Sequence, residues 1–246
     1  MDNERTKEPE AGDQPVTVPG GIAGTGVATH LRDHLDHEMR MVRDDVLRMG
    51  SMVVAAIHEA VEALVAGDRV RATAVIVDDQ QINDMQARIL VQVASTIATQ
   101  APVARDLRYL LALDRVTYEL ERMGDHAASV AKQAQRIADD VPPAANRLRD
   151  IGLVAAELVS DVLRALIDVD EAAARAVAAR DDDVDHRYKA AFDQTMTWLR
   201  AEPNRLADGI SLLFAAHDLE RIGDRATNIA EDVVFLTSGR IEDLNP

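Results

Sequence analysis

One nine-residue pattern occurs twice in this chain, and it constrains the fold more than any other feature of the sequence. The two copies read Glu119-Leu120-Glu121-Arg122-Met123-Gly124-Asp125-His126-Ala127 and Asp218-Leu219-Glu220-Arg221-Ile222-Gly223-Asp224-Arg225-Ala226. Two such complex segments in a chain of 246 residues indicate an internal duplication. We therefore expect two structural units of the same kind.

Apolar residues recur every three or four positions through both halves of the chain, which is the spacing of amphipathic helices. The pattern predicts helices over residues 31–66, 68–99 and from Pro102 to about 138, then over 144–168, 170–200 and 204–237. Pro142 and Pro143 mark the internal boundary, because neither proline suits a continuing helix. The sequence therefore predicts an all-α protein of six long helices, arranged as two tandem three-helix bundles over residues 29–140 and 141–246.

The first 28 residues differ from the rest in composition. They are rich in proline and glycine and hold almost no large apolar residue, so they cannot bury enough surface to offset the entropy of ordering. We expect residues 1–28 to be disordered, with Thr29 as the N-cap of the first helix.

Charge and composition exclude several classes of function. A net charge of −16 argues against a nucleic-acid partner and against binding to anionic membranes. The chain has no cysteine, so it has no disulfide, thiolate metal site or cysteine nucleophile. No apolar run approaches the roughly 20 residues of a membrane span, and no apolar signal segment occurs in residues 1–26. We expect a cytoplasmic protein with no direct membrane insertion.

Within each copy of the pattern, a glutamate and an aspartate stand four residues apart. Glu121 and Asp125 share a helix face, as do Glu220 and Asp224, and like charges at this spacing repel by about 0.2–0.5 kcal/mol. At 100° per residue, Glu121 and Asp125 lie about 120° from the centre of the apolar stripe, so they belong on a partly hydrated shoulder. A repulsion repeated in both halves indicates a cation or a basic partner that offsets it.

The preceding helix of each half carries a matching pair of oxygen ligands. Asp79 and Asn83 are four residues apart in the first half, as are Asp181 and Asp185 in the second. Carboxylate clusters of this kind suit hard or borderline cations such as Mg²⁺, Mn²⁺, Ca²⁺ or iron. The candidate metal ligands are thus Asp79, Asn83, Glu121, Asp125, Asp181, Asp185, Glu220 and Asp224. The alternative is an ordinary acidic surface on which Arg122 and Arg221 pair with Glu119 and Asp218.

Other possible sites have weaker support in the sequence. His30, His34 and His37 share a helix face at a spacing that zinc or nickel accepts, but their outward placement favours a solvated surface. His126 and His217 each occur in only one repeat, so we assign them no essential role. The chain lacks the nucleophile elbow, the Walker A loop and the dinucleotide-binding fingerprint, and it lacks the paired Glu-x-x-His motifs of di-iron oxidases.

At these motifs the chain resembles the PhoU family of phosphate-transport regulatory proteins over about residues 30–240. The resemblance rests on residues 100–108 (QAPVARDLR), 120–127 (LERMGDHA), 219–224 (LERIGD) and 228–231 (NIAE). It implies two tandem three-helix bundles, a homodimer, and surface multinuclear metal sites at the eight candidate ligands, with iron, manganese, magnesium or zinc as the metal. Asn83 departs from the acidic pattern, and Leu213 stands where the first half has Asp114.

The resemblance also implies a function. Family members act by contact: they link the ATPase subunit of a phosphate ABC transporter to a membrane sensor histidine kinase and keep the phosphate-starvation response off when phosphate is plentiful. On this reading the protein is a metal-binding negative regulator and not an enzyme. The alternative is a metal-dependent hydrolase or oxidase that uses the same carboxylates.

Overall fold

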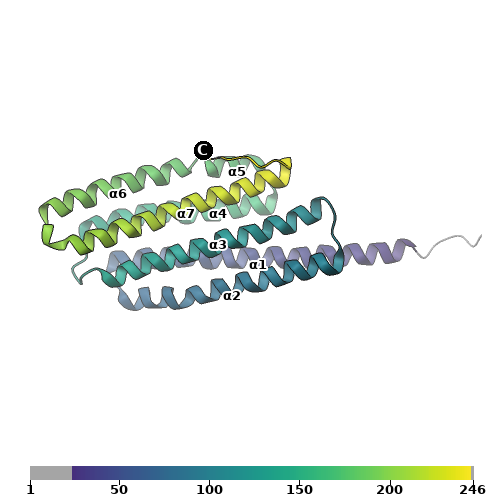
Figure 1. Ribbon diagram of the computed structural model, residues 1–246, viewed down its shortest axis with the longest axis horizontal. Coiled ribbons are helices and arrows are strands. Elements are labelled where there is room, and N and C mark those ends of the chain that lie inside the picture. The colour runs from purple at the N-terminus through teal and green to yellow at the C-terminus, as the bar shows by residue number, and fades with distance from the viewer. Residues whose placement is uncertain (1–23, 245–246) are drawn as a thin grey trace, which may run out of the picture.

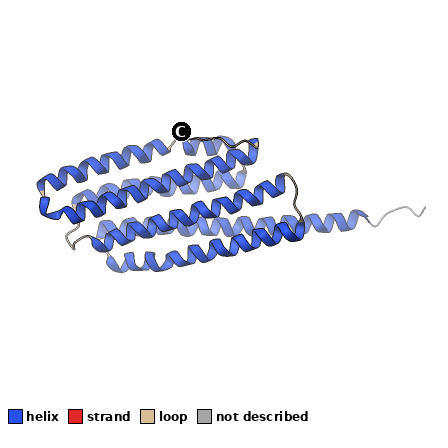
Figure 2. Cartoon of the chain, in the orientation of Figure 1, coloured by secondary structure: helices blue, strands red, loops and turns tan. Residues whose placement is uncertain are grey.

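The computed structural model describes residues 24–244, and helices account for nearly all of them (Figure 2). The long helices are α1 (Gly24–Ala66), α2 (Arg69–Gln100), α3 (Arg105–Arg136), α4 (Asn146–Asp168), α6 (Asp181–Ala201) and α7 (Leu206–Ser238). A short helix, α5 (Glu171–Ala178), precedes α6, and single 3₁₀ turns at Pro143–Ala145 and Pro203–Arg205 precede α4 and α7. No strand occurs within the described range. The all-α prediction is confirmed.

The helices form two layers. In the nearer layer of Figure 1, α2, α3, α7 and α6 lie side by side in that order, with α1 and α4 behind them. Helix α1 packs on α2 and α3, and α4 packs on α6 and α7, so each half of the chain forms one three-helix bundle. The buried apolar side chains of both bundles form one continuous core.

The duplication extends to the turn that ends the first helix of each bundle. Gly67 and Val169 both adopt the left-handed conformation, with φ of +66° and +51°. The next residue caps the following helix: Asp68 accepts a hydrogen bond from Arg71 N at 2.9 Å, and Asp170 accepts one from Ala173 N at 3.0 Å. The same backbone device thus reverses the chain in both bundles, although valine tolerates this conformation less well than glycine.

The predicted continuous helix over residues 170–200 is wrong. It is broken between α5 and α6, where the Arg180 carbonyl accepts a hydrogen bond from Asp183 N at 3.0 Å and closes a turn. Asp181, Asp182 and Asp183 then form the first turn of α6. Three aspartates in sequence are poor helix-interior residues, but they stabilise a helix N-terminus through its dipole. A new helix beginning at Asp181 therefore suits this sequence better than a continuous one.

The predicted N-terminal boundary is also wrong, because α1 begins at Gly24 rather than after Thr29. Thr29 lies inside the helix and is not its N-cap. No proline follows Pro19 in this part of the chain, so no residue blocks the extension of the helix. Residues 1–23, which make up most of the segment predicted to be disordered, lie outside the described residues. The side chains of His34 and His37 are exposed, and that of His30 is outside the described part.

One described segment, Arg32–Ala66 of α1, is long and apolar enough to cross a membrane by length and composition. A stripe of its apolar side chains nevertheless faces the protein interior. Val42, Val46, Met49 and Val53 are fully or almost fully buried in the core. Packing against the other helices of the bundle therefore accounts for the hydropathy of this helix.

The two bundles meet along α3 and α7. At one place on this seam, Glu119 of α3 accepts hydrogen bonds from Arg225 and Asn228 of α7, both at 3.2 Å to its Oε2 atom. Glu119 is the first acid of the repeated pattern, and all three side chains are partly buried. The contact holds the first repeat to the second.

The equivalent acid of the second repeat makes the reciprocal contact. Asp218 Oδ2 accepts a hydrogen bond of 2.6 Å from Ser129, and Asp218 Oδ1 lies 3.0 Å from His126 Nδ1. His126 and Ser129 hold the same places in the first repeat as Arg225 and Asn228 in the second. The seam therefore has approximate two-fold symmetry, as in a homodimer interface.

These contacts correct two interpretations of the sequence. Glu119 and Asp218 do not pair with the arginines of their own helix; they bind the opposite repeat. Arg122 instead lies 3.4 Å from Asp125, and Arg221 lies 3.2 Å from Asp224, measured from NH1 to Oδ2. His126, to which we assign no essential role from the sequence, is part of the seam.

Candidate metal centres

The first group of candidate ligands lies between α2 and α3. Burial raises the pKa of Asp79, and repulsion from Asp125 raises it further, while Lys132 and hydrogen bonding with Asn83 lower it. The pKa of Glu121 is also raised, first by burial and then by the charges of Asp125 and Asp79. The fold thus brings the three carboxylates and Asn83 together from two helices, as the sequence predicts.

Gly124 lets the two helices of this group approach each other. A Cβ atom at residue 124 would lie 3.1 Å from Asp79 Oδ1 and 3.0 Å from Ile82 Cδ1. Any larger residue would push α2, or at least the Asp79 carboxylate, away from α3. The glycine of the repeated pattern therefore positions a candidate ligand that belongs to the neighbouring helix.

The second group lies between α6 and α7 and is unevenly buried: Asp181 is buried, Glu220 and Asp224 are half-buried, and Asp185 is exposed. Only 3% of Asp181 is exposed, although the sequence suggested a surface position. Burial, followed by the charges of Asp224, Asp185 and Glu220, raises the pKa of Asp181 to about 7. Burial likewise raises the pKa of Glu220 and of Asp224, with added repulsion from Asp185 on each. All four candidates of this half are therefore electrostatic neighbours.

Several buried oxygens of the first group have unmet bonding capacity. Among the described residues, Asp79 Oδ1, Asn83 Oδ1 and Asp114 Oδ1 are buried without a hydrogen-bond partner. Asp114 lies two helical turns before Glu121 on the same face of α3, and burial raises its pKa. A buried oxygen without a partner is unfavourable, and a bound cation would satisfy it. The donor set of hard oxygen ligands therefore fits a cation such as Mg²⁺, Mn²⁺ or iron.

The carboxylates are not arranged around a single point in their present rotamers. Within the described part of the chain, no three His, Asp or Glu side chains converge closely enough to hold an ion. Neighbouring basic side chains contact three of the candidate ligands instead. Arg122 and Arg221 bind Asp125 and Asp224, and His217 Nδ1 lies 3.1 Å from Glu220 Oε2. The mutual effects on pKa show that the carboxylates of each group are electrostatic neighbours.

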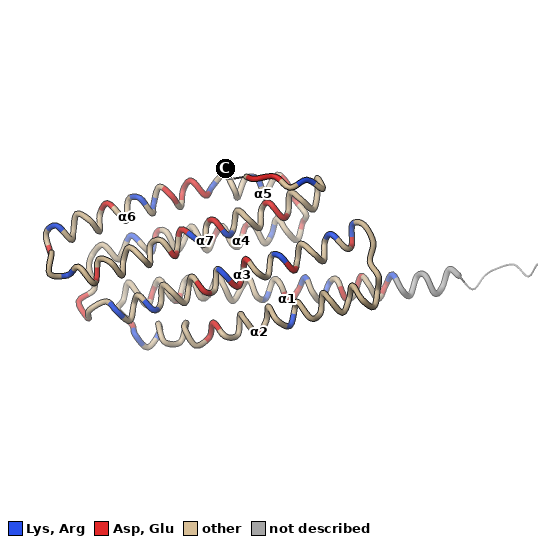
Figure 3. The backbone as a smooth tube through the Cα atoms, in the orientation of Figure 1, with Lys and Arg blue, Asp and Glu red and all other residues tan. Residues whose placement is uncertain are grey.

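Acidic residues mark both groups in the charge view of the chain. Red segments lie along α3 and α7 and at the first turn of α6 (Figure 3). Both groups are in the layer formed by α2, α3, α7 and α6. The second group has more acidic neighbours than the first, because Asp182 and Asp183 follow Asp181 in the first turn of α6.

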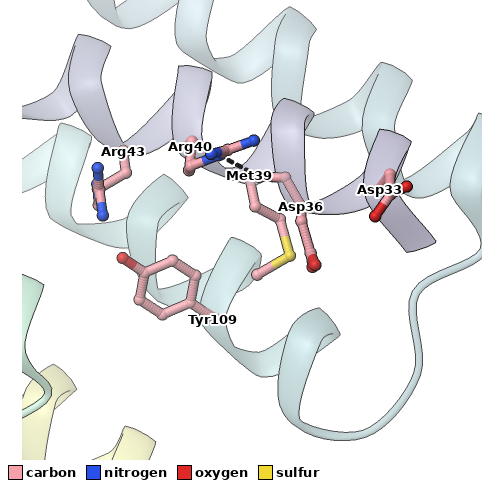
Figure 4. A pocket seen from close by; sticks show the side chains of 6 residues that line it. All are labelled: Asp33, Asp36, Met39, Arg40, Arg43 and Tyr109. Carbon is pink, nitrogen blue, oxygen red and sulfur yellow. Dashed lines mark hydrogen bonds between the residues drawn. The ribbon is translucent and has the colours of Figure 1, made fainter. Parts of the chain in front are cut away.

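A wide hollow of about 610 Å³ between α1 and α3 is a separate feature (Figure 4). Tyr109 and Met39 line it together with Arg40, Arg43, Asp33 and Asp36. Tyr109 lies about 18 Å along α3 from Glu121, so the hollow does not belong to the acid group. Its charges are of both signs, and Arg40 Nε donates to the Asp36 carbonyl oxygen at 3.1 Å. This hollow has no concentration of charge that would select an ion.

Fold and site together define a class of protein: a duplicated helical bundle in which each repeat holds an acid group between its second and third helices. The PhoU domain family matches the chain over residues 46–134 and 148–233, which lie in the two repeats. The chain belongs to the PhoU family.

Curated relatives and solved structures agree with this assignment. The phosphate-specific transport system accessory protein PhoU homolog of Xylella fastidiosa (strain Temecula1 / ATCC 700964) is 35% identical over 85% of this chain and 88% of its own length. The homolog of that name from Pseudomonas aeruginosa is 33% identical over 85% and 88% of the two chains.

Two crystal structures are similar in fold. PhoU from Pseudomonas aeruginosa has a TM-score of 0.78 and 33% identity, and the match covers 83% of this chain and 99% of that one. The phosphate transport system regulatory protein PhoU from Streptococcus pneumoniae has a TM-score of 0.79 and 28% identity, with 85% and 99% covered.

Proposed function

We propose that this protein is the accessory regulator of a phosphate-specific transport system and represses the phosphate-starvation response when phosphate is plentiful. Membership of the PhoU family, over both repeats, is the observation that carries this proposal. The protein acts in the cytoplasm as an adaptor and not as an enzyme. It contacts the ATPase subunit of the transporter and a membrane sensor histidine kinase, and it forms a homodimer.

The two acid groups give the adaptor its metal sites. In the first repeat Asp79, Asn83, Glu121 and Asp125 hold the cation, and in the second Asp181, Asp185, Glu220 and Asp224 hold it. A bound cation supplies positive charge that offsets the repulsion among the carboxylates and ties the second helix of each bundle to the third. Burial and the raised pKa values of Asp79 and Asp181 support the proposal, because both disfavour a cluster of bare negative charges.

Deletion of the gene in its host tests the regulatory role. We expect alkaline phosphatase and phosphate-transporter expression to rise in phosphate-rich medium, and the intact gene to restore repression. A complementing gene with Glu121→Gln, Asp125→Asn, Glu220→Gln and Asp224→Asn separates the metal role from the scaffold role. Unchanged reporter expression after deletion, in a host without a second member of the family, contradicts the proposal.

Metal analysis of protein purified without chelators or an affinity tag tests the sites themselves. Glu121→Gln with Asp125→Asn should remove metal from the first bundle only, and Glu220→Gln with Asp224→Asn from the second only. The matched control is Asp193→Asn with Glu202→Gln, two exposed acids outside both groups, which should keep the full metal content. A wild-type protein that takes up neither Mn²⁺, Mg²⁺, Zn²⁺ nor iron contradicts the metal proposal and leaves the regulatory proposal standing.

A further inference from the structure

His217 of α7 lies beside the second acid group. Its Nδ1 atom is 3.1 Å from Oε2 of Glu220, a candidate metal ligand. Its ring lies 6.3 Å from that of Tyr188 on α6, measured between centroids, so the histidine lies between α6 and α7, as the acids do. The side chain of His217 is 53% exposed, and an ion can therefore reach it from solvent.

The helix register makes His217 the next member of this group. On α7, His217, Glu220 and Asp224 stand at i, i+3 and i+7, which is one face of a helix. On α6, Tyr188 lies beside His217, and Asp185, one turn earlier, is close enough to Glu220 to raise its pKa. The two antiparallel helices thus bring carboxylates and an imidazole together along one line of contact (Figure 1).

The separation of His217 and Glu220 matches that of neighbouring ligands of one ion. Zinc binds histidine nitrogen and carboxylate oxygen at about 2.0–2.2 Å, so two such ligands at octahedral or tetrahedral angles lie about 2.8–3.6 Å apart. The observed separation is 3.1 Å. Within the described residues, His217 is the one histidine whose ring nitrogen contacts a candidate ligand: His126 contacts Asp218, and His186 contacts a backbone carbonyl.

The first repeat has no equivalent nitrogen. Tyr118 holds the place of His217, and Asn83 holds that of Asp185. All four candidate ligands of the first group offer oxygen atoms, and the oxygen of Asn83 is uncharged. A histidine that occurs in one repeat only is what a chemical difference between the two sites requires.

Charge separates the two groups in the same direction. Lys132 is near enough to the first group to lower the pKa of Asp79, whereas Glu231 holds the place of Lys132 in the second repeat. The second group also has Asp182 and Asp183 beside it. It therefore attracts a cation more strongly than the first group does.

An imidazole ligand changes which cation a site prefers. Carboxylate and carbonyl oxygens suit Mg²⁺ and Mn²⁺, whereas imidazole suits zinc, iron and nickel. Mg²⁺ is bound through oxygen ligands and retained water, so it gains little from a nearby nitrogen. Zinc gains a ligand that it binds at short distance.

We propose that His217 binds the cation of the second group as a nitrogen ligand, beside Glu220 and Asp224, and that this group prefers Zn²⁺ or Fe²⁺. The first group, with oxygen ligands alone, takes Mg²⁺ or Mn²⁺. The two repeats thus hold cations of different classes. This inference rests on the proposed metal sites and adds a ligand, and the class of cation, to one of them.

Calorimetry of Zn²⁺ and Mg²⁺ binding by the full chain, freed of metal with EDTA, tests the inference. Glu121→Gln with Asp125→Asn isolates the second group. In this background His217→Gln should weaken Zn²⁺ binding at least about tenfold, because a ligand is lost, and change Mg²⁺ binding less than about twofold. His34→Gln, at an exposed histidine of α1, is the matched control and should leave both affinities unchanged.

The ring nitrogens of His217 report directly on coordination. ¹⁵N NMR of protein labelled at histidine separates a nitrogen bound to zinc from one that only shares a hydrogen bond, because the two resonate at different positions. In the background that isolates the second group, Zn²⁺ should move the ring resonance that is absent from the spectrum of His217→Gln. Mg²⁺ should leave that resonance in place.

Three results overturn the inference, and they are distinguishable. Equal Zn²⁺ affinity with and without His217→Gln, or an unmoved ring resonance, leaves His217 as a hydrogen-bond partner of Glu220 only. Glu220→Gln with Asp224→Asn isolates the first group, and an equal ratio of Zn²⁺ to Mg²⁺ affinity in the two isolated groups excludes the difference in selectivity. Failure of the wild type to bind any of these cations contradicts the metal proposal as a whole, while the gene deletion still decides the regulatory proposal.

Circular dichroism shows whether each variant is folded. His217→Ala replaces His217→Gln if that protein is unfolded, and the same changes in affinity are expected of it.

Discussion

The carboxylate of Asp181 fills the space that a side chain at Gly223 would occupy. Its Oδ1 atom lies 2.7 Å from the position of a Cβ atom at residue 223, closer than real contacts to Cβ. Gly223 belongs to α7 and Asp181 to the first turn of α6, so the absence of a side chain at residue 223 leaves room for the Asp181 carboxylate against α7. In the first bundle the equivalent separation, from Asp79 Oδ1 to a Cβ atom at Gly124, is 3.1 Å.

This relationship predicts different effects for the two glycines. Gly223→Ala should lower the free energy of unfolding by about 1–2 kcal/mol, because displacement of the buried Asp181 costs more than the helix propensity that alanine adds. Asp79 leaves more room at Gly124 than Asp181 leaves at Gly223. Gly124→Ala should therefore lower the free energy of unfolding by less than half as much as Gly223→Ala. Urea denaturation of both variants in the presence of EDTA measures the difference. Equal effects would contradict the role assigned to Gly223.

The reciprocal seam predicts equal sensitivity at its two acids. Glu119→Ala leaves Arg225 and Asn228 without their acceptor, and Asp218→Ala does the same to His126 and Ser129. Each should lower the free energy of unfolding by about 1–3 kcal/mol, the typical effect of leaving partly buried donors unpaired.

The control for the seam is Glu157→Ala. Glu157 Oε2 forms an exposed ion pair of 3.1 Å with Arg180 NH2, and exposed pairs contribute at most about 1 kcal/mol. Chemical denaturation of the three variants should therefore separate the two seam acids from Glu157. If Glu119→Ala is no more destabilising than Glu157→Ala, the seam does not depend on these hydrogen bonds.

Asp232 predicts a dependence of stability on pH. Burial raises its pKa to about 7, Arg115 lowers it, and Glu119 and Glu231 raise it. An unfolded aspartate has a pKa of about 3.9, so the folded state binds more protons between about pH 4 and pH 7, and the free energy of unfolding falls as the pH rises through that range.

Asp232→Asn removes this contribution. The loss of unfolding free energy between pH 5 and pH 8 should be smaller in the variant than in wild type, by an amount on the order of a few kcal/mol. Other acids with raised pKa values, such as Asp181, maintain part of the pH dependence of stability in the variant. Thermal unfolding of both proteins at several pH values, with EDTA present, measures this pH dependence. An unchanged slope with pH in the variant would contradict the assignment to Asp232.

The left-handed backbone of Ala101 indicates that replacing this residue with glycine should stabilise the fold. This exposed residue ends α2 in the left-handed conformation, with φ of +44°, where a side chain costs about 1–2 kcal/mol. Ala101→Gly should raise the free energy of unfolding by about 0.5–1 kcal/mol, after allowance for the greater unfolded-state entropy of glycine. Ala98→Gly, one turn earlier in α2, should instead lower it by about 1 kcal/mol. Changes of the same sign in both variants, measured by denaturation, would exclude the backbone explanation.

Much of the fold could be predicted from sequence because helix burial repeats every three to four residues. Leu113, Val116, Leu120 and Met123 form one buried face in α3, as that spacing requires. The pairing of Asp79 with Glu121 could also be predicted, since the duplication points to the same places in both repeats. Periodicity on a single helix does not, however, show which other helix its polar face meets. For that reason the partners of Glu119 and Asp218 in the opposite repeat were missed.

The break before Asp181 escaped prediction for a different reason. A continuous helix over residues 170–200 preserves the apolar period almost as well as two helices do, and the first repeat has an unbroken α2 at the equivalent place. The signal that distinguishes them is the run of Asp181, Asp182 and Asp183, which favours a helix start. The new start turns Asp181 towards α7, which explains why this candidate ligand is buried rather than exposed.

The two-fold seam has a consequence for how the repeats could diverge. In a true homodimer a substitution appears on both sides of the axis at once, so neither side can change alone. Here both sides belong to one polypeptide and are always made in equal number and in a fixed orientation. The first repeat can therefore carry Asp114 where the second carries Leu213, which lines an apolar hollow with Ile210 and Phe214. Covalent linkage thus lets a nearly symmetric scaffold present two chemically different faces.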